Sequence, residues 1–161
     1  MIGSLLFDKS GEERTVTLWR SRDGGRAWEW ELEREKRDNP PLTLRASKWT
    51  GPAEEWASVT PVVLHHYPKR RPGDVERIVF EAFEQVGLPR PVQLRVQPVS
   101  AFTGAAAARS MPEFTEGGAT MCRYQAHIIV RFASRVRGPL LVGRGRFRGY
   151  GLLRPVEVNH G

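Results

Sequence analysis

Apolar and polar residues alternate along the first part of the chain. Thr15 to Trp19 is rich in residues that favour β-structure, and Asp23 to Gly25 is a typical turn sequence. Beyond this turn Trp28 and Trp30 alternate with glutamates, which is the period of a strand with one apolar face. The pattern therefore predicts a β-hairpin near the N-terminus.

From residue 58 onwards the period of the pattern changes twice. Val59 to Leu64 is a short apolar run, which predicts a buried strand. Apolar residues at helical spacing then predict a helix over residues 74–86, which Asp74 would cap and Gly87 would end. Val92 to Gln97 again alternates apolar and polar side chains, so we expect a half-buried strand there.

The remaining residues predict two further strands. Cys122 to Arg131 alternates strictly, and Leu152 to Val158 forms a last, mostly apolar run. Between them, Gly138 to Val142 is interpreted as a short helical turn. The segment from Ser100 to Thr120 is rich in glycine and alanine, and we expect a loop.

The predicted order of elements is strand, helix, strand, strand, short helix, strand. This is the βαββαβ arrangement of an α+β, ferredoxin-like (RRM-like) fold, with helices on one face of a sheet. We therefore divide the chain into a β-hairpin extension with a linker, residues 1–57, and a ferredoxin-like domain, residues 58–161. The open face of the sheet is expected to present Gln93, Arg95, Gln97, Arg123, Gln125, His127 and Arg131. Such a layer of arginine and glutamine could bind RNA.

Length and composition limit the alternatives. The 161 residues suit one domain with a small addition, and 40% apolar residues suit a folded protein. No run reaches the roughly 18 apolar residues of a membrane span, and the apolar start breaks at Asp8, which argues against a secretory signal. The single cysteine, Cys122, cannot form an internal disulfide, so we expect a cytoplasmic protein. No metal-ligand spacing is seen, and no cofactor is expected.

The charge is concentrated near the C-terminus. With 25 basic and 18 acidic residues the net charge is 25 − 18 = +7. Residues 117–161 contain eight arginines, no lysine and one acidic residue, Glu157. The planar guanidinium matches phosphate with two hydrogen bonds and stacks on bases, so this concentration favours a nucleic-acid partner. The alternative is a basic surface that only keeps the protein soluble.

A glycine-rich loop at residues 143–151 is the strongest local feature. Its four glycines allow the backbone to approach a phosphate closely, its three arginines add charge, and its two aromatic residues could stack on bases. It lacks the Gly-Lys-Ser/Thr ending of a Walker A loop. The loop consists of Gly143, Arg144, Gly145, Arg146, Phe147, Arg148, Gly149, Tyr150 and Gly151. A flexible RGG-like linker is the alternative, but the flanking leucines argue for a loop anchored in the fold.

Three histidines are candidates for acid–base chemistry. RNA cleavage without metal needs a base for the ribose 2′-hydroxyl and an acid for the leaving 5′-oxygen, and histidine titrates near neutral pH. His127 lies on the predicted polar sheet face, and His65 and His66 follow the strand 59–64. Cations must stabilise the transition state. Basic residues near the histidine pair, Lys69, Arg70 and Arg71, suit that role. A structural or RNA-contacting histidine is the alternative for each.

Three segments in this order resemble a known family: Trp56 to Leu64, Val86 to Pro91 and, above all, Arg137 to Leu152. Together they resemble the C-terminal part of the type I-G (formerly I-U) CRISPR-associated fusion subunit. That subunit is a member of the RAMP superfamily (repeat-associated mysterious proteins). The likeness spans about residues 45–156. Because the chain is much shorter than the fusion, we expect it to correspond to the part of the fusion without the capping module.

The resemblance implies a ferredoxin-like architecture, binding of CRISPR repeat or guide RNA, and metal-independent cleavage that leaves a 2′,3′-cyclic phosphate and a 5′-hydroxyl. Gly143, Gly145, Gly149 and Gly151 correspond to the family's glycine-rich loop. His127 corresponds to a histidine in the strand before that loop. Relatives have Asp-Arg where this chain has His65-His66, so the resemblance favours His127 as the catalyst. Other effector subunits would be partners, and DNA would not be a direct one.

Two further interpretations remain open on the sequence. The same domain could hold the repeat-derived handle of a guide RNA without cutting it, because neither the charge nor the loop encodes catalysis. It could also be a general RNA-binding domain outside CRISPR. An enzyme acting on a small molecule ranks last, because the sequence contains no clear nucleophile–base pair or metal cluster.

Overall fold

The computed structural model describes residues 12–13, 15–22, 25–69, 71–112, 114 and 123–156, and within the first part the side chains of residues 16–30 and 32 are outside the description. The chain divides into two compact units, residues 1–44 and 45–161. Arg70, one of the predicted RNA contacts, lies outside the described residues. None of the described helices combines the length and the hydropathy of a membrane span.

The first unit contains the predicted hairpin. Strands β1 (Val16–Arg22) and β2 (Gly25–Leu32) pair antiparallel, with Val16 opposite Leu32 and Arg22 opposite Gly25. The register shifts between Arg20 and Ser21, which marks a bulge. A 3₁₀ helix, η2 (Leu42–Leu44), ends the unit.

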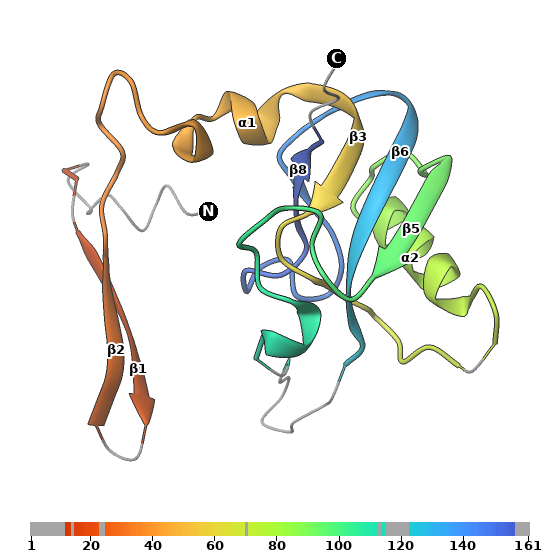
Figure 1. Ribbon diagram of the computed structural model, residues 1–161, viewed down its shortest axis with the longest axis horizontal. Helices are drawn as coiled ribbons and strands as arrows, with labels where there is room; N and C mark the ends of the chain where they lie inside the picture. The colour runs from red at the N-terminus through yellow and green to blue at the C-terminus, as the bar shows by residue number, and fades with distance from the viewer. Residues whose placement is uncertain are drawn as a thin grey trace. The chain divides into compact units, whose positions relative to one another are not determined.

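An antiparallel sheet forms the centre of the second unit. Its long strand β6 (Gln125–Arg137) pairs with β3 (Pro52–Ser58) on one edge and with β5 (Gln93–Gln97) on the other. Strand β8 (Leu152–Pro155) pairs with the outer side of β3. The order β8-β3-β6-β5, with α2 (Asp74–Glu84) between β3 and β5 in sequence, is that of a ferredoxin-like fold. The predicted fold class is confirmed (Figure 1).

Two short strands complete the sheet, and one of them corrects the sequence prediction. Strand β4 (Val62–Val63) pairs with the beginning of β6. The predicted helical turn over Gly138 to Val142 is wrong, because Leu140 and Leu141 form strand β7, paired with Leu153 and Leu152 of β8. The glycine-rich loop between β7 and β8 thus replaces the second helix of the ferredoxin-like arrangement.

The first strand of this sheet begins earlier than predicted. The apolar run Val59 to Leu64 contributes only the two residues of β4, whereas β3 covers residues 52–58 and includes Glu54 and Glu55. Glu54 and Glu55 interrupt the apolar pattern, so the sequence does not indicate a strand here. The next residue, Trp56, is nevertheless completely buried. Residues 45–57, including helix α1 (Ser47–Thr50), therefore fold with the second unit and not with the hairpin extension.

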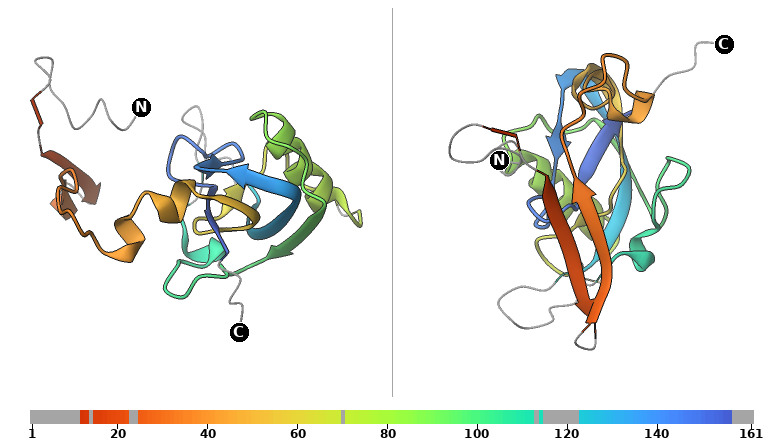
Figure 2. Two further views of the ribbon diagram at one scale, coloured as in Figure 1. Left: turned by 90° about the horizontal axis from the view of Figure 1, so that it is seen from above. Right: turned by 90° about the vertical axis from the view of Figure 1, so that its left-hand side faces the viewer.

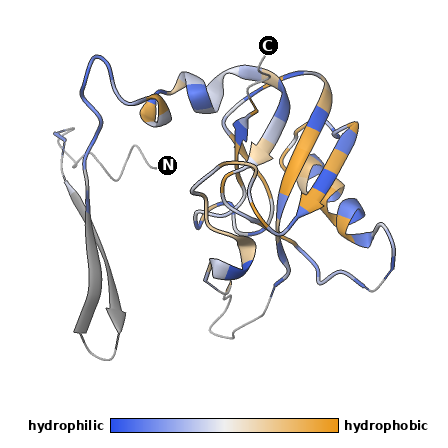
Figure 3. Ribbon diagram, viewed as in Figure 1, coloured by the Kyte–Doolittle hydropathy of each residue, from blue (hydrophilic) through white to orange (hydrophobic). Residues whose placement is uncertain are grey.

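Helix α2 packs against one face of the sheet. Its apolar residues Ile78, Val79, Ala82 and Phe83 are buried, and the Phe83 ring meets Phe132 of β6 edge to face at 5.6 Å. Figure 3 shows the matching alternation of hydrophobic and hydrophilic residues along β5 and β6. The helix starts directly at Asp74, with Gly73 in the N-cap position at φ +80°, so the predicted cap is displaced by one residue.

The opposite face of the sheet is only partly open. The segment that carries η3 (Ala108–Ser110) lies on this side, and α2 lies on the other (Figure 2, right). This segment covers His127, which is completely buried. Its Nε2 donates to the carbonyl of Ala106 at 2.9 Å, and its Nδ1 lies 3.0 Å from the hydroxyl of Ser58. The prediction that His127 is displayed on an open polar face is therefore wrong.

Backbone contacts fix the glycine-rich loop onto β4. The amide of Arg144 donates to the carbonyl of Val63 at 2.9 Å, and the amide of Gly151 donates to the carbonyl of Pro61 at 2.9 Å. Gly151 has φ +67°, and a Cβ there would lie 1.8 Å from the carbonyl oxygen of Val142. Only glycine allows this approach, so the loop is an anchored part of the fold.

We expect Gly151→Ala to lower the free energy of unfolding by about 2–5 kcal/mol, because it combines a left-handed backbone with steric overlap. Gly149 provides the matched control. It has φ +84° but open space around its Cβ position, so Gly149→Ala is expected to cost only about 1–2 kcal/mol. Urea denaturation of the two variants measures the difference, and equal losses would contradict the close docking.

Replacement of His127 tests its structural role. His127→Ala should lower the free energy of unfolding by about 1–3 kcal/mol, because the buried Ser58 hydroxyl loses the acceptor for its proton and the Ala106 carbonyl loses its donor. His66→Ala, at an exposed position, should stay within about 0.5 kcal/mol of the original protein. Thermal and urea denaturation report both values, and an unchanged stability of His127→Ala would refute this role.

Candidate nucleic-acid interface

The histidine pair after β4 lies beside the glycine-rich loop. Because Val63 accepts a hydrogen bond from the loop, the next residues of the chain, Leu64 to His66, emerge at the loop's edge. The side chain of Leu64 is buried in the core, that of His65 is half-buried and that of His66 is exposed. The fold thus brings the predicted histidine pair and the predicted loop together.

Three guanidinium groups lie close enough to His65 to act on its ring electrostatically. Burial lowers the pKa of His65, and the positive charges of Arg144, Arg146, His66 and Arg123 lower it further. Arg123 also donates a hydrogen bond from its guanidinium to the carbonyl of His65. We call these five residues (His65, His66, Arg123, Arg144 and Arg146) the His65 cluster. Because its positive charges come from three separate segments, tertiary structure is needed to assemble it.

This environment determines the protonation state of the His65 ring. A pKa below the usual 6.5 keeps the imidazole neutral at pH 7. Its Nδ1 is buried and finds no hydrogen-bond partner among the described residues. The ring can therefore exchange a proton with a ligand only through Nε2. A neutral imidazole among cations is suited to accept a proton next to a bound anion.

Aromatic rings order the arginines of the loop. The guanidinium of Arg146 lies 4.5 Å from the ring centre of Phe147, and that of Arg148 lies 5.2 Å from the ring centre of Phe114. Phe147 is 76% exposed, so it offers a free aromatic face. Cation–π contacts of this kind hold a guanidinium in place without neutralising its charge.

Tyr150 does not present its ring to a ligand, which corrects the prediction that it stacks on bases. It is buried with Val63 and Phe114, which it meets edge to face at 5.9 Å. Its hydroxyl donates to the carbonyl of Pro112 at 2.8 Å, and burial raises its pKa. The backbone of Gly145 packs directly against the Tyr150 side chain. Tyr150 therefore stabilises the loop from within.

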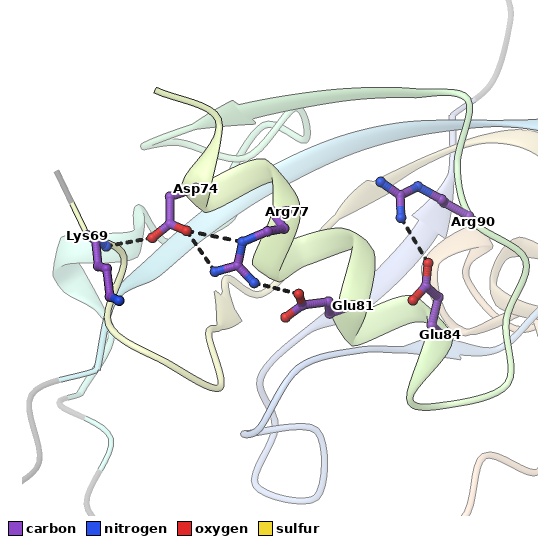
Figure 4. A network of polar contacts seen from close by, with 6 residues as sticks. All are labelled: Lys69, Asp74, Arg77, Glu81, Glu84 and Arg90. Carbon is purple, nitrogen blue, oxygen red and sulfur yellow. Dashed lines mark hydrogen bonds and ion pairs between the residues drawn. The ribbon is translucent and has the colours of Figure 1, made fainter. Parts of the chain in front are cut away.

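Lys69 and Arg71 belong to a loop that is fastened to helix α2. The carboxylate of Asp74 accepts the backbone N–H of Lys69 at 2.6 Å and a guanidinium N–H of Arg77 at 2.7 Å, as Figure 4 shows. These hydrogen bonds, from Arg77 first and then from Lys69, lower the pKa of Asp74. The side chains of Lys69 and Arg71 are exposed.

Arg95 and Arg131 lie elsewhere. Both are exposed on the sheet face opposite α2, where they line one shallow cavity with Glu55 and Gln93. Arg131 also contacts the carboxylate of Glu54 at 3.5 Å. The structure therefore separates the predicted RNA contacts into the glycine-rich loop with its neighbours and a second, mixed-charge patch on the sheet.

Two features of the interface escaped the sequence analysis. Tyr67, next to the histidine pair, is 67% exposed and meets Tyr124 edge to face at 6.5 Å. Phe114 supports both Arg148 and Tyr150 from the segment predicted as a loop. An aromatic residue directly after two histidines was a usable signal for Tyr67, but nothing near Phe114 in sequence indicates its role.

The described residues contain no group of three or more His, Cys, Asp or Glu side chains placed to hold a metal ion together. The interface thus offers a neutral imidazole, several guanidinium groups and exposed aromatic rings. This is the set of groups that recognises a ribose–phosphate chain.

Comparison with known proteins gives one match. No curated protein and no solved structure matches the chain. The model of the family described as CRISPR-associated protein, GSU0054 family, matches residues 31–155, which include β3, the histidine pair and the whole glycine-rich loop. The chain therefore belongs to the GSU0054 family of CRISPR-associated proteins.

Proposed function

We propose that this protein is a CRISPR RNA-processing endoribonuclease of the RAMP type, which binds repeat RNA at the glycine-rich loop and cleaves it without metal. The likeness to the C-terminal part of the type I-G fusion subunit supports this assignment. So does membership of a CRISPR-associated family. The observation that carries the proposal is the half-buried His65 imidazole beside the glycine-rich loop, which docks on Val63, with Arg123 bonded to the His65 carbonyl and a pKa that burial and the arginines lower.

The reaction assigns a role to each member of the His65 cluster. The guanidinium groups bind the phosphate at the cleaved linkage and stabilise the negative charge of the transition state. Nε2 of His65 accepts the proton of the ribose 2′-hydroxyl, whose oxygen attacks phosphorus. The bond from phosphorus to the 5′-oxygen breaks, and His66 acts as the general acid that gives that oxygen a proton. The products are a 2′,3′-cyclic phosphate and a 5′-hydroxyl.

This assignment moves the catalytic role from His127 to His65. Both ring nitrogens of His127 already have partners inside the protein, and the ring is completely buried. The resembling family has Asp-Arg at the positions of His65 and His66, but in this chain His65 lies next to the glycine-rich loop. The structure of this chain thus favours a different base from the one that the resemblance suggested. Further basic residues would contact the RNA backbone on either side of the cleaved linkage: Lys69, Arg71 and Arg148.

One prediction concerns His65 as the general base. His65→Ala should lower the cleavage rate of the repeat RNA by about 10²–10⁴-fold, the usual contribution of general base catalysis. Binding of the same RNA with a 2′-deoxy nucleotide at the cleavage position should change less than about fivefold, because His65 acts on a proton rather than on the phosphate. Single-turnover rates with EDTA present, together with filter binding, measure both quantities.

A modified substrate separates the base from the acid. In an RNA with sulfur in place of the bridging 5′-oxygen, the leaving group departs without a proton. This RNA should restore cleavage by His66→Ala but not by His65→Ala. Arg135→Gln, at an exposed position on β6 away from the loop, is the matched control and should leave the rate unchanged. RNA that is bound but never cut would instead establish a non-cleaving handle-binding module, and complete inhibition by EDTA would exclude the metal-free reaction.

A second prediction concerns pH. Burial and the neighbouring cations lower the pKa of His65, so the active neutral form persists below pH 6.5. The acidic limb of kcat/KM, which reports the free enzyme, should therefore have its midpoint below pH 6.5. Replacing both Arg144 and Arg146 by Gln should raise the pKa of His65 and move this acidic limb to higher pH. If the acidic limb of the kcat/KM profile lies at the same pH in the double variant and in the original protein, the role of His65 is contradicted.

A further inference from the structure

A cavity of about 490 Å³ lies next to the His65 cluster. It is formed where β5 ends and β6 begins, below the segment that carries η3. Its floor is apolar, from Val96, Ala108 and Ala126. Aromatic and polar side chains also line it, from Tyr67, Gln97, Arg109, Arg123 and Tyr124, together with the apolar Met111. The proposed cleavage reaction uses none of the floor and only Arg123 among these other side chains.

The chemistry of the lining selects a flat, polar-edged ligand. Tyr67 and Tyr124 supply ring surfaces, and Tyr67 is exposed enough to receive a second ring. Arg109 and Arg123 supply positive charge, and Gln97 supplies an amide that can both donate and accept. No acidic side chain lines the cavity among the described residues. Aromatic faces, guanidinium planes and an amide around an apolar floor are what an unstacked base requires.

The cavity and the His65 cluster share residues. Arg123 lines the cavity, and its guanidinium donates to the carbonyl of His65. Tyr67 lines the cavity and follows His65 by two residues in the chain. A ligand whose phosphate lies on the cluster can therefore extend directly into the cavity.

We propose that this cavity receives one unpaired nucleobase of the RNA, splayed out next to the phosphate that the His65 cluster binds. This inference rests on the proposed function. It adds a specificity pocket in which Tyr67 stacks on the base. Arg109 forms hydrogen bonds with the polar edge of that base or with the phosphate of the same nucleotide. The pocket explains why an exposed tyrosine, the Gln97 amide and an apolar floor accompany a site that otherwise recognises only the backbone.

Removal of single bases tests the pocket. The probe is the repeat RNA with a 2′-deoxy nucleotide at the cleavage position, made as a series in which one base at a time is replaced by hydrogen. With the original protein, one abasic position beside the cleavage site should weaken binding at least about fivefold. Tyr67→Ala should weaken binding of the intact RNA by a similar factor, and the same abasic position should then have no further effect.

Matched variants separate the ring from the charge. Tyr67→Phe keeps the aromatic face and should bind almost as tightly as the original protein. Val99→Ala removes apolar surface at an exposed position outside the cavity and should leave the abasic profile unchanged. Arg109→Gln should weaken binding of the intact RNA more than Arg135→Gln does.

The outcomes distinguish this inference from the proposed function. If the repeat RNA is bound and cut but every abasic position has the same effect in the original protein and in Tyr67→Ala, the pocket is refuted alone. If the original protein does not bind the RNA at all, both fail. A Tyr67→Ala variant that binds RNA normally but loses an effector subunit would assign the cavity to a protein partner and overturn the proposal.

Discussion

The close backbone approach of the glycine-rich loop to β4 is the constraint on which the interface depends. Two amides of the loop donate to carbonyls of Pro61 and Val63, and Gly143 and Gly151 leave no room for a Cβ at these contacts. This docking sets Arg144 and Arg146 beside the residues that follow β4, and those residues are the histidine pair. Without the glycines the loop could not reach the strand, and His65 would lose the loop arginines that, after burial, lower its pKa.

The fold accommodates this loop by omitting a helix. A complete ferredoxin-like domain places a second helix between its third and fourth strands. Here the short strand β7 and the loop occupy that place, so the chain passes from β6 to β8 on the surface beside β4. The internal packing of Tyr150 and Phe114 replaces part of the missing helix as a small secondary core. A surface built in this way presents backbone and guanidinium groups instead of a helix face.

The two candidate histidines, His65 and His127, differ in how many of their ring nitrogens have hydrogen-bond partners. His127 is fixed between Ser58 and Ala106, and the hydroxyl of Ser58 also accepts the N–H of Ile128, so the pair fastens β3, β6 and the η3 segment together. His65 retains a buried nitrogen without such a partner among the described residues and lies among positive charges. A fully satisfied polar group contributes stability, whereas an incompletely satisfied one at a charged surface is typical of a functional site.

The sequence by itself determined the hairpin, the helix α2, strands β5 and β6 and the α+β class, because their periodicity and turn residues are local signals. It also identified the glycine-rich loop and the concentration of arginine in the last quarter of the chain. Only the tertiary structure decided that β3 starts at Pro52, that Gly138 to Val142 contains a strand, and that His127 is enclosed. The physical reason is that burial, strand pairing and the gathering of Arg123, Arg144 and Arg146 around His65 depend on contacts between residues far apart in the chain. No periodic pattern encodes such contacts.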